Sequence, residues 1–428
     1  MKHIELLAPA KDLECGMTAI DCGADAVYIG AAHFGAREAA GNSVEDITAL
    51  TRYAHRYWAK VYVTINTLLH DEEIPEALRL ITQLYEAGID GLIIQDPGLL
   101  ECKLPPLPLI ASTQMHNSTP EKVAFLEGVG FQRAILPREL GLEEIREIRR
   151  KTNMELEFFI HGSLCVCYSG QCYLSYAMGG RSGNRGQCAQ PCRKVYTLLD
   201  SRGQAVVRNK HLLSLRDLNL SAHLAELIEA GICSFKIEGR LKDRAYIANI
   251  VGYYRTLLDG VLADLGMRKG SSGAVALGFA PDPTKTFNRG YTTHFLHGRG
   301  KPDASIDTPK MIGEPIGRVT TISRRDITVD SSVELHNGDG ICFFDRAGEL
   351  HGTAINGIFG KRFSLLNPDG VEEGMRLYRN HDHEFLTNVQ KSHPERQVAV
   401  TFTLREAPEG FLLQAVDEDG NNAEFMLP

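Results

Sequence analysis

The sequence predicts an α/β protein built on a TIM-like (β/α)8 barrel, followed by a small antiparallel β-barrel. Three observations favour this fold: eight short apolar segments in the first 260 residues, amphipathic stretches between them, and a change to short β segments after residue 311. Buried parallel strands are short apolar runs, and their alternation with helices is typical of a parallel sheet. An open doubly wound sheet is the alternative that the same alternation allows.

The eight apolar segments are rich in β-branched or aromatic residues, as buried strands are. They cover residues 4–7, 26–29, 60–65, 91–95, 107–111, 133–136, 156–160 and 234–238. The stretches 43–58 and 72–87 have the amphipathic pattern of helices. Ser43 and Thr119 are suited to cap helix N-termini, and Pro120 fits a first helical turn. We therefore expect a barrel unit over residues 1–264.

One connection in this unit is abnormal, because the stretch between the seventh and eighth strands is far longer than an ordinary βα loop. We expect a cysteine-rich insertion there, over residues 161–216. Loops that follow barrel strands lie at the C-terminal rim, where the active sites of such barrels form. The insertion is therefore expected to face the active site.

The rest of the chain is predicted to form smaller units. Residues 265–310 are rich in Gly, Pro, Ser and Thr and are interpreted as a linker and covering loop. Within 311–380, short β segments at 316–322, 326–329, 340–345, 352–358 and 362–366, separated by turns, predict the antiparallel barrel. Residues 381–428 resemble the start of a further, truncated C-terminal unit, which is too small to bury a core alone.

Composition narrows the protein class. Hydrophobic residues make up 43% of the chain and the net charge is −8, which indicates a folded protein without a generally basic surface. We find neither a signal-peptide pattern nor an apolar run of 18 residues. The sequence thus predicts a cytoplasmic protein with no membrane span. Cysteines in that compartment are reduced, so disulfides are the weaker interpretation of the cysteine cluster.

Five of the ten cysteines lie between Cys165 and Cys192. Cys165, Cys172, Cys188 and Cys192 follow one another at intervals of 7, 16 and 4 residues. Four thiolates complete either a zinc site or an iron–sulfur cluster. Paired Cys-x2-Cys knuckles, which zinc ribbons use, are missing, so we favour iron–sulfur over zinc and over no metal. Cys167 alternates with Cys165 and is predicted to be a buried thiol facing the other way.

Polar residues follow most of the predicted strands. Each alone is readily explained as a hydrogen-bonded rim residue, but together they favour a polar pocket facing the cysteines. They are Asn66, Gln95, Asp96, Gln114, His116, Arg138, Glu139, His161, Lys236, Glu238 and Arg240.

The insertion is also basic. From Arg181 to Arg216, and including Arg185, it holds eight lysines or arginines and one acid, Asp200. A solvated loop face is one interpretation of this charge. The other is a surface for RNA phosphates beside the active site.

Several segments resemble the collagenase-like peptidase family U32: the opening 5–10, the cysteine segments 157–165 and 168–175, and residues 234–240. Despite the family's name, this resemblance implies hydroxylation of RNA, or of ubiquinone, without dioxygen. It also implies an oxygen-sensitive iron–sulfur cluster, expected to be 4Fe-4S, with Cys165, Cys172, Cys188 and Cys192 as its ligands. Such a cluster implies assembly machinery and an electron donor as partners.

Within the family, the chain is most similar to the branch that makes 5-hydroxycytidine in 23S ribosomal RNA. A sister branch makes 5-hydroxyuridine at the tRNA wobble position, and both are associated with prephenate. We therefore expect Arg138, Arg240 and Lys236 to hold a carboxylated co-substrate, since arginine forks match carboxylates. His161 and Glu238 are the candidates for proton transfer, with Lys236 grouped among the catalytic residues. The remaining candidates for substrate binding are Arg181, Arg185, Asn66 and Gln114.

Two other functions fit parts of the sequence. A collagenase-like peptidase would use Cys165 with His161 as an activated nucleophile and its base. A zinc-stiffened RNA-binding module would use the cysteines, the basic insertion and the small β-barrel without catalysis.

Overall fold

The computed structural model describes residues 3–36, 41–300, 303–323, 326–331, 333–360 and 362–428. Within these residues, eight parallel strands form a closed barrel, in which β12 pairs with both β8 and β1. The predicted (β/α)8 barrel is therefore confirmed, and the open doubly wound sheet is wrong because the sheet has no free edge between β8 and β1. The barrel strands are β1 (His3–Ala10), β2 (Ala26–Ala31), β4 (Lys60–Ile65), β5 (Gly91–Ile94), β6 (Leu109–Ala111), β7 (Arg133–Ile135), β8 (Glu155–Ser163) and β12 (Ser234–Ile237).

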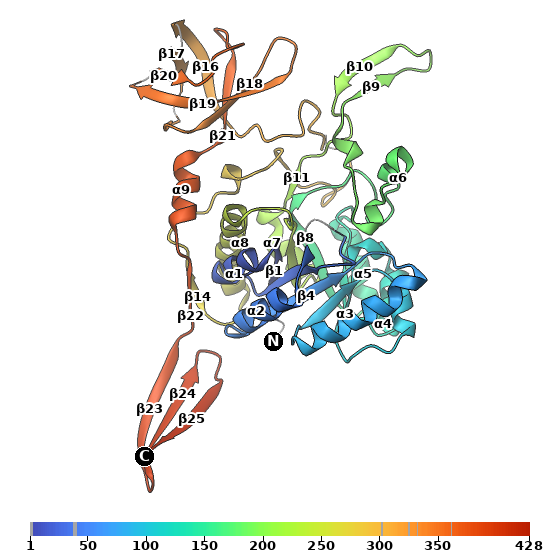
Figure 1. Cartoon of the computed structure of the whole chain (residues 1–428), viewed down its shortest axis with the longest axis vertical. Coiled ribbons are helices and arrows are strands. Elements are labelled where there is room, and N and C mark those ends of the chain that lie inside the picture. Colours follow the sequence, from blue (N-terminus) through green and yellow to red (C-terminus); the bar gives the residue numbers. More distant parts are fainter. Residues whose placement is uncertain (1–2, 37–40, 301–302, 324–325, 332, 361) are drawn as a thin grey trace.

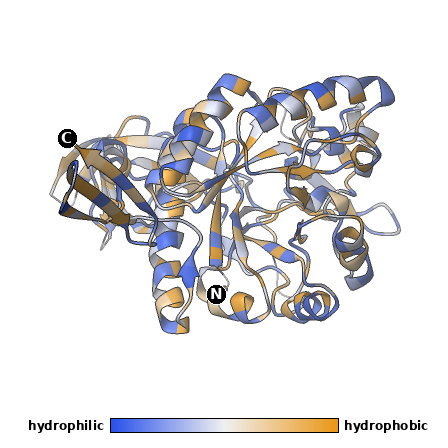
Figure 2. Cartoon of the chain, turned by 90° about the horizontal axis from the view of Figure 1, so that it is seen from below, coloured by the Kyte–Doolittle hydropathy of each residue, from blue (hydrophilic) through white to orange (hydrophobic). Residues whose placement is uncertain are grey.

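Helices surround the barrel (Figure 1). Ser43 and Thr119 cap α2 and α4 by accepting hydrogen bonds from the backbone N–H groups of Asp46 and Lys122, at 3.0 and 3.2 Å. Figure 2 shows these helices with hydrophilic and hydrophobic sides, as helices between a core and water require. They are α1 (Leu13–Asp21), α2 (Val44–His55), α3 (Ile74–Glu86), α4 (Pro120–Gly128), α5 (Leu142–Lys151), α7 (Leu224–Glu229) and α8 (Arg244–Leu265).

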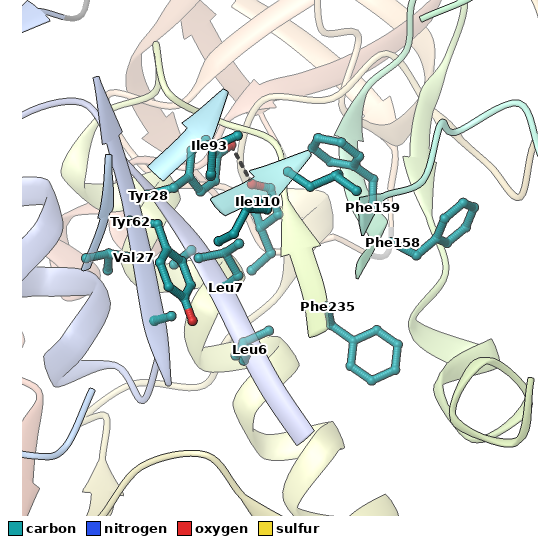
Figure 3. Packing of buried hydrophobic residues seen from close by; sticks show 14 of the residues in the cluster. Leu6, Leu7, Val27, Tyr28, Tyr62, Ile93, Ile110, Phe158, Phe159 and Phe235 are labelled. Atoms are coloured by element: carbon teal, nitrogen blue, oxygen red, sulfur yellow. Dashed lines mark hydrogen bonds between the residues drawn. The ribbon is translucent and has the colours of Figure 1, made fainter. Parts of the chain in front are cut away.

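The strands bury side chains on both faces. In Figure 3, Leu7, Ile93 and Ile110 point into the interior of the barrel, whereas Phe158 and Phe235 point outward. All of these side chains are buried. Burial on both faces explains why the strand segments are almost continuously apolar in the sequence.

The cysteine-rich insertion follows β8, the seventh barrel strand. It contains the short helix α6 (Leu174–Gly179) and a hairpin of β9 (Tyr196–Leu199) and β10 (Ala205–Lys210), which projects from the molecule in Figure 1. It returns through β11 (Asp217–Asn219), which pairs antiparallel with the end of β8. The chain after α8 covers this region through β15 (Tyr291–Thr292), which pairs with β11.

A second closed barrel follows. In the part of the chain that the structure describes, it has six antiparallel strands, of which the last, β21, was missing from the sequence prediction. Ile327, Ile341, Phe343 and Leu377 are buried in its core. Its strands are β16 (Glu314–Ser323), β17 (Asp326–Asp330), β18 (Gly340–Phe344), β19 (Leu350–Phe359), β20 (Arg362–Leu365) and β21 (Arg376–His381).

The chain after β21 first packs against the (β/α)8 barrel and then extends away from it. Helix α9 (His383–Lys391) contacts α8, and β22 (Glu395–Gln397) pairs with β14 (Ala274–Ala276). A three-stranded sheet then extends away from the barrel in Figure 1: β23 (Val400–Ala407), β24 (Gly410–Asp417) and β25 (Asn422–Leu427). No helix among the described residues is long and apolar enough to cross a membrane.

Candidate active site

A cavity of about 520 Å³ lies between the carboxyl ends of the barrel strands and the insertion. From the barrel, Tyr28, Thr64, Ile93, Phe159 and Lys236 line it, and from the insertion all five clustered cysteines do. Its volume lies within the range of small-molecule sites. The insertion is therefore the roof of a pocket whose floor is the mouth of the barrel.

Cys165, Cys172, Cys188 and Cys192 line this one cavity as free thiols. Burial raises the pKa of the Cys192 thiol, Arg193 opposes this shift, and the nearby charges of Cys165, Cys188 and Cys172 add to it. Within the described residues, no three cysteine sulfurs lie within 4.8 Å of one another. The thiols thus surround a common space that is wider than a compact single-ion site.

The backbone around Cys188 is adapted to a sulfur ligand. The backbone N–H of Gln190 donates to Sγ of Cys188 at 3.3 Å. A Cβ at Gly183 would lie 3.7 Å from Cβ of Cys188 and 4.0 Å from its Sγ, which are ordinary van der Waals distances, so Gly183 packs beside this cysteine. Backbone donors to sulfur are typical of iron–sulfur sites.

The prediction for Cys167 is wrong. Its side chain is half-buried, lines the same cavity as the other four and donates to the carbonyl of Gln171 at 3.4 Å. Alternation between Cys165 and Cys167 does not hold because this segment is a loop, not an extended strand.

Two contacts hold the insertion on the rim of the barrel. Glu139 accepts hydrogen bonds from the backbone N–H and the hydroxyl of Ser169, at 2.6 and 3.0 Å. At Gly170, with φ of +71°, a Cβ would lie 1.9 Å from the carbonyl oxygen of Gln114. Only glycine permits this approach and this backbone conformation together.

Arginines make further anchors. Arg193 donates to the carbonyls of Leu164 and Leu215, at 2.8 and 2.7 Å, and so joins the two ends of the insertion. Arg185 forms an ion pair with Glu73, with 2.6 Å between Nη2 and Oε1. Arg185 is not among the described residues that line the cavity. The structure therefore gives it a tethering contact where the sequence suggested substrate binding.

Three cations lie on the floor of the cavity. Lys236 pairs with Glu157 at 2.8 Å, Arg138 pairs with Glu238 at 2.8 Å, and Arg240 donates to the hydroxyl of Thr64 at 2.8 Å. Burial lowers the pKa of Lys236, and Glu157 opposes that shift. The guanidinium of Arg138 also lies 3.6 Å from the centre of the Phe159 ring. The three expected carboxylate-binding side chains are thus brought together.

The other polar candidates occupy the cavity walls. Asn66 accepts from the backbone N–H of Ala36 at 2.9 Å and donates to the hydroxyl of Ser112 at 3.2 Å. Arg181 donates to the carbonyl of Gln187 at 3.1 Å. Asn66, Gln114 and Arg181 all line the cavity.

Sequence reasoning missed a charged network beneath this floor. Arg133 lies 3.2 Å from the second oxygen of Glu157 and also pairs with Glu5, whose other oxygen accepts from Tyr62 at 2.8 Å. Neighbouring Arg133 favours the charged form of Glu5 and lowers the pKa of this carboxyl although burial opposes it. The signal was present, because these charged residues interrupt otherwise apolar strands.

His161 does not join the site. It is buried against the rings of Tyr246, Tyr254 and Tyr291 and is not among the described residues that line the cavity. Burial lowers the pKa of its imidazole to about 3, with a smaller contribution from Lys242. The predicted proton transfer by His161 in the cavity has no geometric support, nor does a Cys165–His161 peptidase pair.

The fold and the site define a (β/α)8 barrel protein with a thiol-lined cavity at the carboxyl ends of its strands, roofed by a cysteine-rich insertion. Residues 11–305 match Peptidase family U32, and the chain belongs to this family.

Proteins whose names describe different functions are similar in sequence to this chain. The chain is 44% identical to the Escherichia coli 23S rRNA 5-hydroxycytidine C2501 synthase, covering 98% of this chain and 65% of the relative. It is 39% identical to the Bacillus subtilis tRNA hydroxylation protein P1, over 61% of this chain and 65% of the relative. It is 27% identical to a Porphyromonas gingivalis collagenase, over 88% and 94%. The chain thus spans about two thirds of the length of the two RNA-modifying relatives.

Proposed function

We propose that this protein hydroxylates C5 of a pyrimidine in RNA, with cytidine in 23S ribosomal RNA favoured over the tRNA wobble uridine. One observation carries the proposal: five free thiols, together with Lys236, Arg138 and Arg240, line a single cavity at the carboxyl ends of the barrel strands. The names of the two RNA-modifying relatives support the substrate class, and the higher identity to the ribosomal-RNA synthase supports the choice of cytidine.

We infer that Cys165, Cys172, Cys188 and Cys192 hold an iron–sulfur cluster, of the 4Fe-4S type. Tetrahedral zinc with bonds of about 2.3 Å would bring its sulfurs to about 3.8 Å from one another. No three cysteine sulfurs of the described chain lie within 4.8 Å of one another, which favours a larger inorganic group over a zinc-stiffened module. When bound, such a cluster supplies electron transfer or Lewis acidity. Assembly machinery and an electron donor are then partners.

The floor of the cavity supports a carboxylated co-substrate such as prephenate. Lys236, Arg138 and Arg240 offer charge-assisted donors there, and arginine suits a carboxylate through its forked geometry. Glu238, held by Arg138 at 2.8 Å, is positioned to move a proton at the cavity wall.

The roof of the cavity supports RNA binding. Tyr168, Tyr173 and Tyr176 are exposed near the cysteines, and exposed aromatic rings stack with unpaired bases. The projecting β9–β10 hairpin carries Arg202 and Arg208, which suit phosphates. Chemistry at a ring carbon requires a base out of its stack, and the cavity volume of about 520 Å³ is ample for one pyrimidine.

The test is complementation of a strain that lacks the gene, followed by mass spectrometry of its ribosomal and transfer RNA. The wild-type gene is expected to restore one 5-hydroxypyrimidine, in cultures grown with or without dioxygen. Cys165→Ser is expected to abolish it, while the matched control Cys233→Ser, outside the cavity, retains it. An RNA profile that does not change between the deletion and the complemented strain would refute the proposal.

The cluster is tested separately on protein purified without oxygen. Iron and sulfide counts and a visible absorption band are expected for wild type and Cys233→Ser and are lost in Cys165→Ser. Zinc in place of iron in the wild type would contradict the assignment of the cluster.

A further inference from the structure

Outside the cavity, three metal-binding side chains from two distant segments meet. Nδ1 of His223 lies 2.9 Å from Oε1 of Glu226, and Nε2 of His297 lies 3.4 Å from that Nδ1 and 3.5 Å from Oε2 of Glu226. His223 is the N-cap residue of α7 and Glu226 lies in its first turn, whereas His297 follows β15. None of the three is among the described residues that line the cavity.

A hydrogen bond accounts for one of these three separations. Nδ1 of His223, when it carries the proton, donates to Oε1 of Glu226 at 2.9 Å. Nε2 of His297 then faces that N–H group across 3.4 Å and lies 3.5 Å from Oε2 of Glu226. A cation between the groups would engage both ring nitrogens and the carboxylate at once.

The distances also suit a metal. Zinc binds imidazole nitrogen and carboxylate oxygen at about 2.0–2.2 Å, so tetrahedral ligands are about 3.3 Å apart. The two ring nitrogens lie 3.4 Å apart, close to that value, and they lie 2.9 and 3.5 Å from the two different oxygens of the Glu226 carboxylate. One ligand atom from each residue lies within 4.8 Å of the other two. Imidazole with carboxylate is a donor set suited to zinc and neighbouring first-row divalent metals.

We propose that His223, Glu226 and His297 bind one divalent transition-metal ion, zinc in the first place, with water in the fourth position. The site joins helix α7 of the barrel to the covering segment that runs from α8 to the second barrel. That segment already contacts α5 next to the site, where the backbone N–H of Leu142 donates to the carbonyl of Leu296 at 2.9 Å. The ion is therefore expected to stabilise the packing of the covering segment against the (β/α)8 barrel.

The full chain, freed of metal by a chelator, is titrated with cobalt(II), and bound metal is followed by visible absorption. A site of nitrogen and oxygen ligands gives ligand-field bands without thiolate-to-cobalt charge transfer, which separates it from the cysteines. The expected result is one such site in the wild type and in Cys165→Ser. We expect at least a tenfold loss of affinity in His297→Ala and in Glu226→Gln.

The matched control is His55→Ala, because His55 is an exposed histidine that contacts a single carboxylate, Asp90. It is expected to leave cobalt binding unchanged. Zinc is also expected to raise the melting temperature of the wild type but not that of His297→Ala. Unchanged affinity in both site variants, or cobalt bands that disappear in Cys165→Ser, would overturn the proposal. These results do not depend on RNA hydroxylation, so the two proposals can fail separately.

Discussion

The ammonium group of Lys236 lies 2.8 Å from Oε1 of Glu157, beneath the floor of the cavity, and both side chains are buried. The other oxygen of Glu157 lies 3.2 Å from Arg133. Glu157 thus compensates two buried cations on neighbouring strands. The position and charge of Lys236 in the cavity depend on this carboxylate.

Glu157→Gln is expected to destabilise the barrel by about 3–5 kcal/mol, because it leaves Lys236 buried without a counter-charge. Urea unfolding of the full chain measures this loss. The control is Glu155→Gln, which removes a carboxylate that also pairs with Arg133 but whose side chain is 56% exposed. It is expected to cost less than about 1 kcal/mol. Equal losses in the two variants would contradict a compensating role for Glu157.

Gly170→Ala is expected to detach the roof of the cavity from its rim. The added Cβ would overlap the carbonyl oxygen of Gln114, and φ of +71° adds backbone strain. Gly203→Ala isolates the strain, because Gly203 has φ of +75° and no atom within 4 Å of the added Cβ. Gly203→Ala is expected to lower the free energy of unfolding by about 1–2 kcal/mol at most.

The readout for these two glycine variants is limited proteolysis, with iron content measured in parallel. Faster cleavage within residues 161–216 and loss of iron are expected for Gly170→Ala only. Similar behaviour of both variants would mean that backbone strain, and not the contact with Gln114, decides the effect.

The Arg185–Glu73 ion pair is expected to restrain the insertion. Arg185→Glu places two acids together and should increase the cleavage rate of the insertion several-fold. The double variant Arg185→Glu with Glu73→Arg restores opposite charges and is expected to recover most of the protection. Arg202→Glu, at the tip of the exposed hairpin, serves as the control for charge alone. No recovery in the double variant would argue against the pair as a tether.

His161 is expected to contribute to acid sensitivity. Its folded-state pKa of about 3 lies below the unfolded value near 6.5, so between these values only the unfolded chain binds the proton. The free energy of unfolding therefore falls as the pH falls, by about 1.6 kcal/mol between pH 6.5 and pH 5.

His161→Gln should remove this part of the pH dependence, whatever its effect on stability at neutral pH. The measurement is urea unfolding at several pH values, with His55→Gln at the surface as the control. A slope that is unchanged in His161→Gln would show that the imidazole is protonated in the folded protein.

Much of the fold was predictable because local patterns carry it. Each of the eight apolar segments overlaps a barrel strand, and the length of the chain between the last two strands located the insertion. Strand β21 was missed because most of its residues, RLYRNH, are polar and do not alternate with apolar ones, and pairing with β16 and β18 stabilises it. Pairing of this kind is not visible within one segment.

Some residues of the candidate site were also predictable from local patterns, and others were not. The cysteines and the cations at the strand ends were found because parallel strands place their carboxyl ends together. His161 was placed wrongly because alternation from Phe159 would point it into the barrel. A register irregularity between Lys236 and Ile237, opposite β8, shifts the alternation and turns His161 toward α8.

The sequence by itself determined the barrel, the cysteine-rich insertion and the membership of a chemical class, because spacing, apolar runs and residue types are properties of one chain segment at a time. Only the tertiary structure decided which charges compensate one another, as Glu157 does for Lys236 and Arg133, and which residues of the insertion pair with the barrel outside the cavity, as Arg185 does with Glu73. The tertiary structure also brings the imidazoles of His223 and His297 close together. These relations depend on strand register and loop packing, because both bring together residues that are far apart in the sequence.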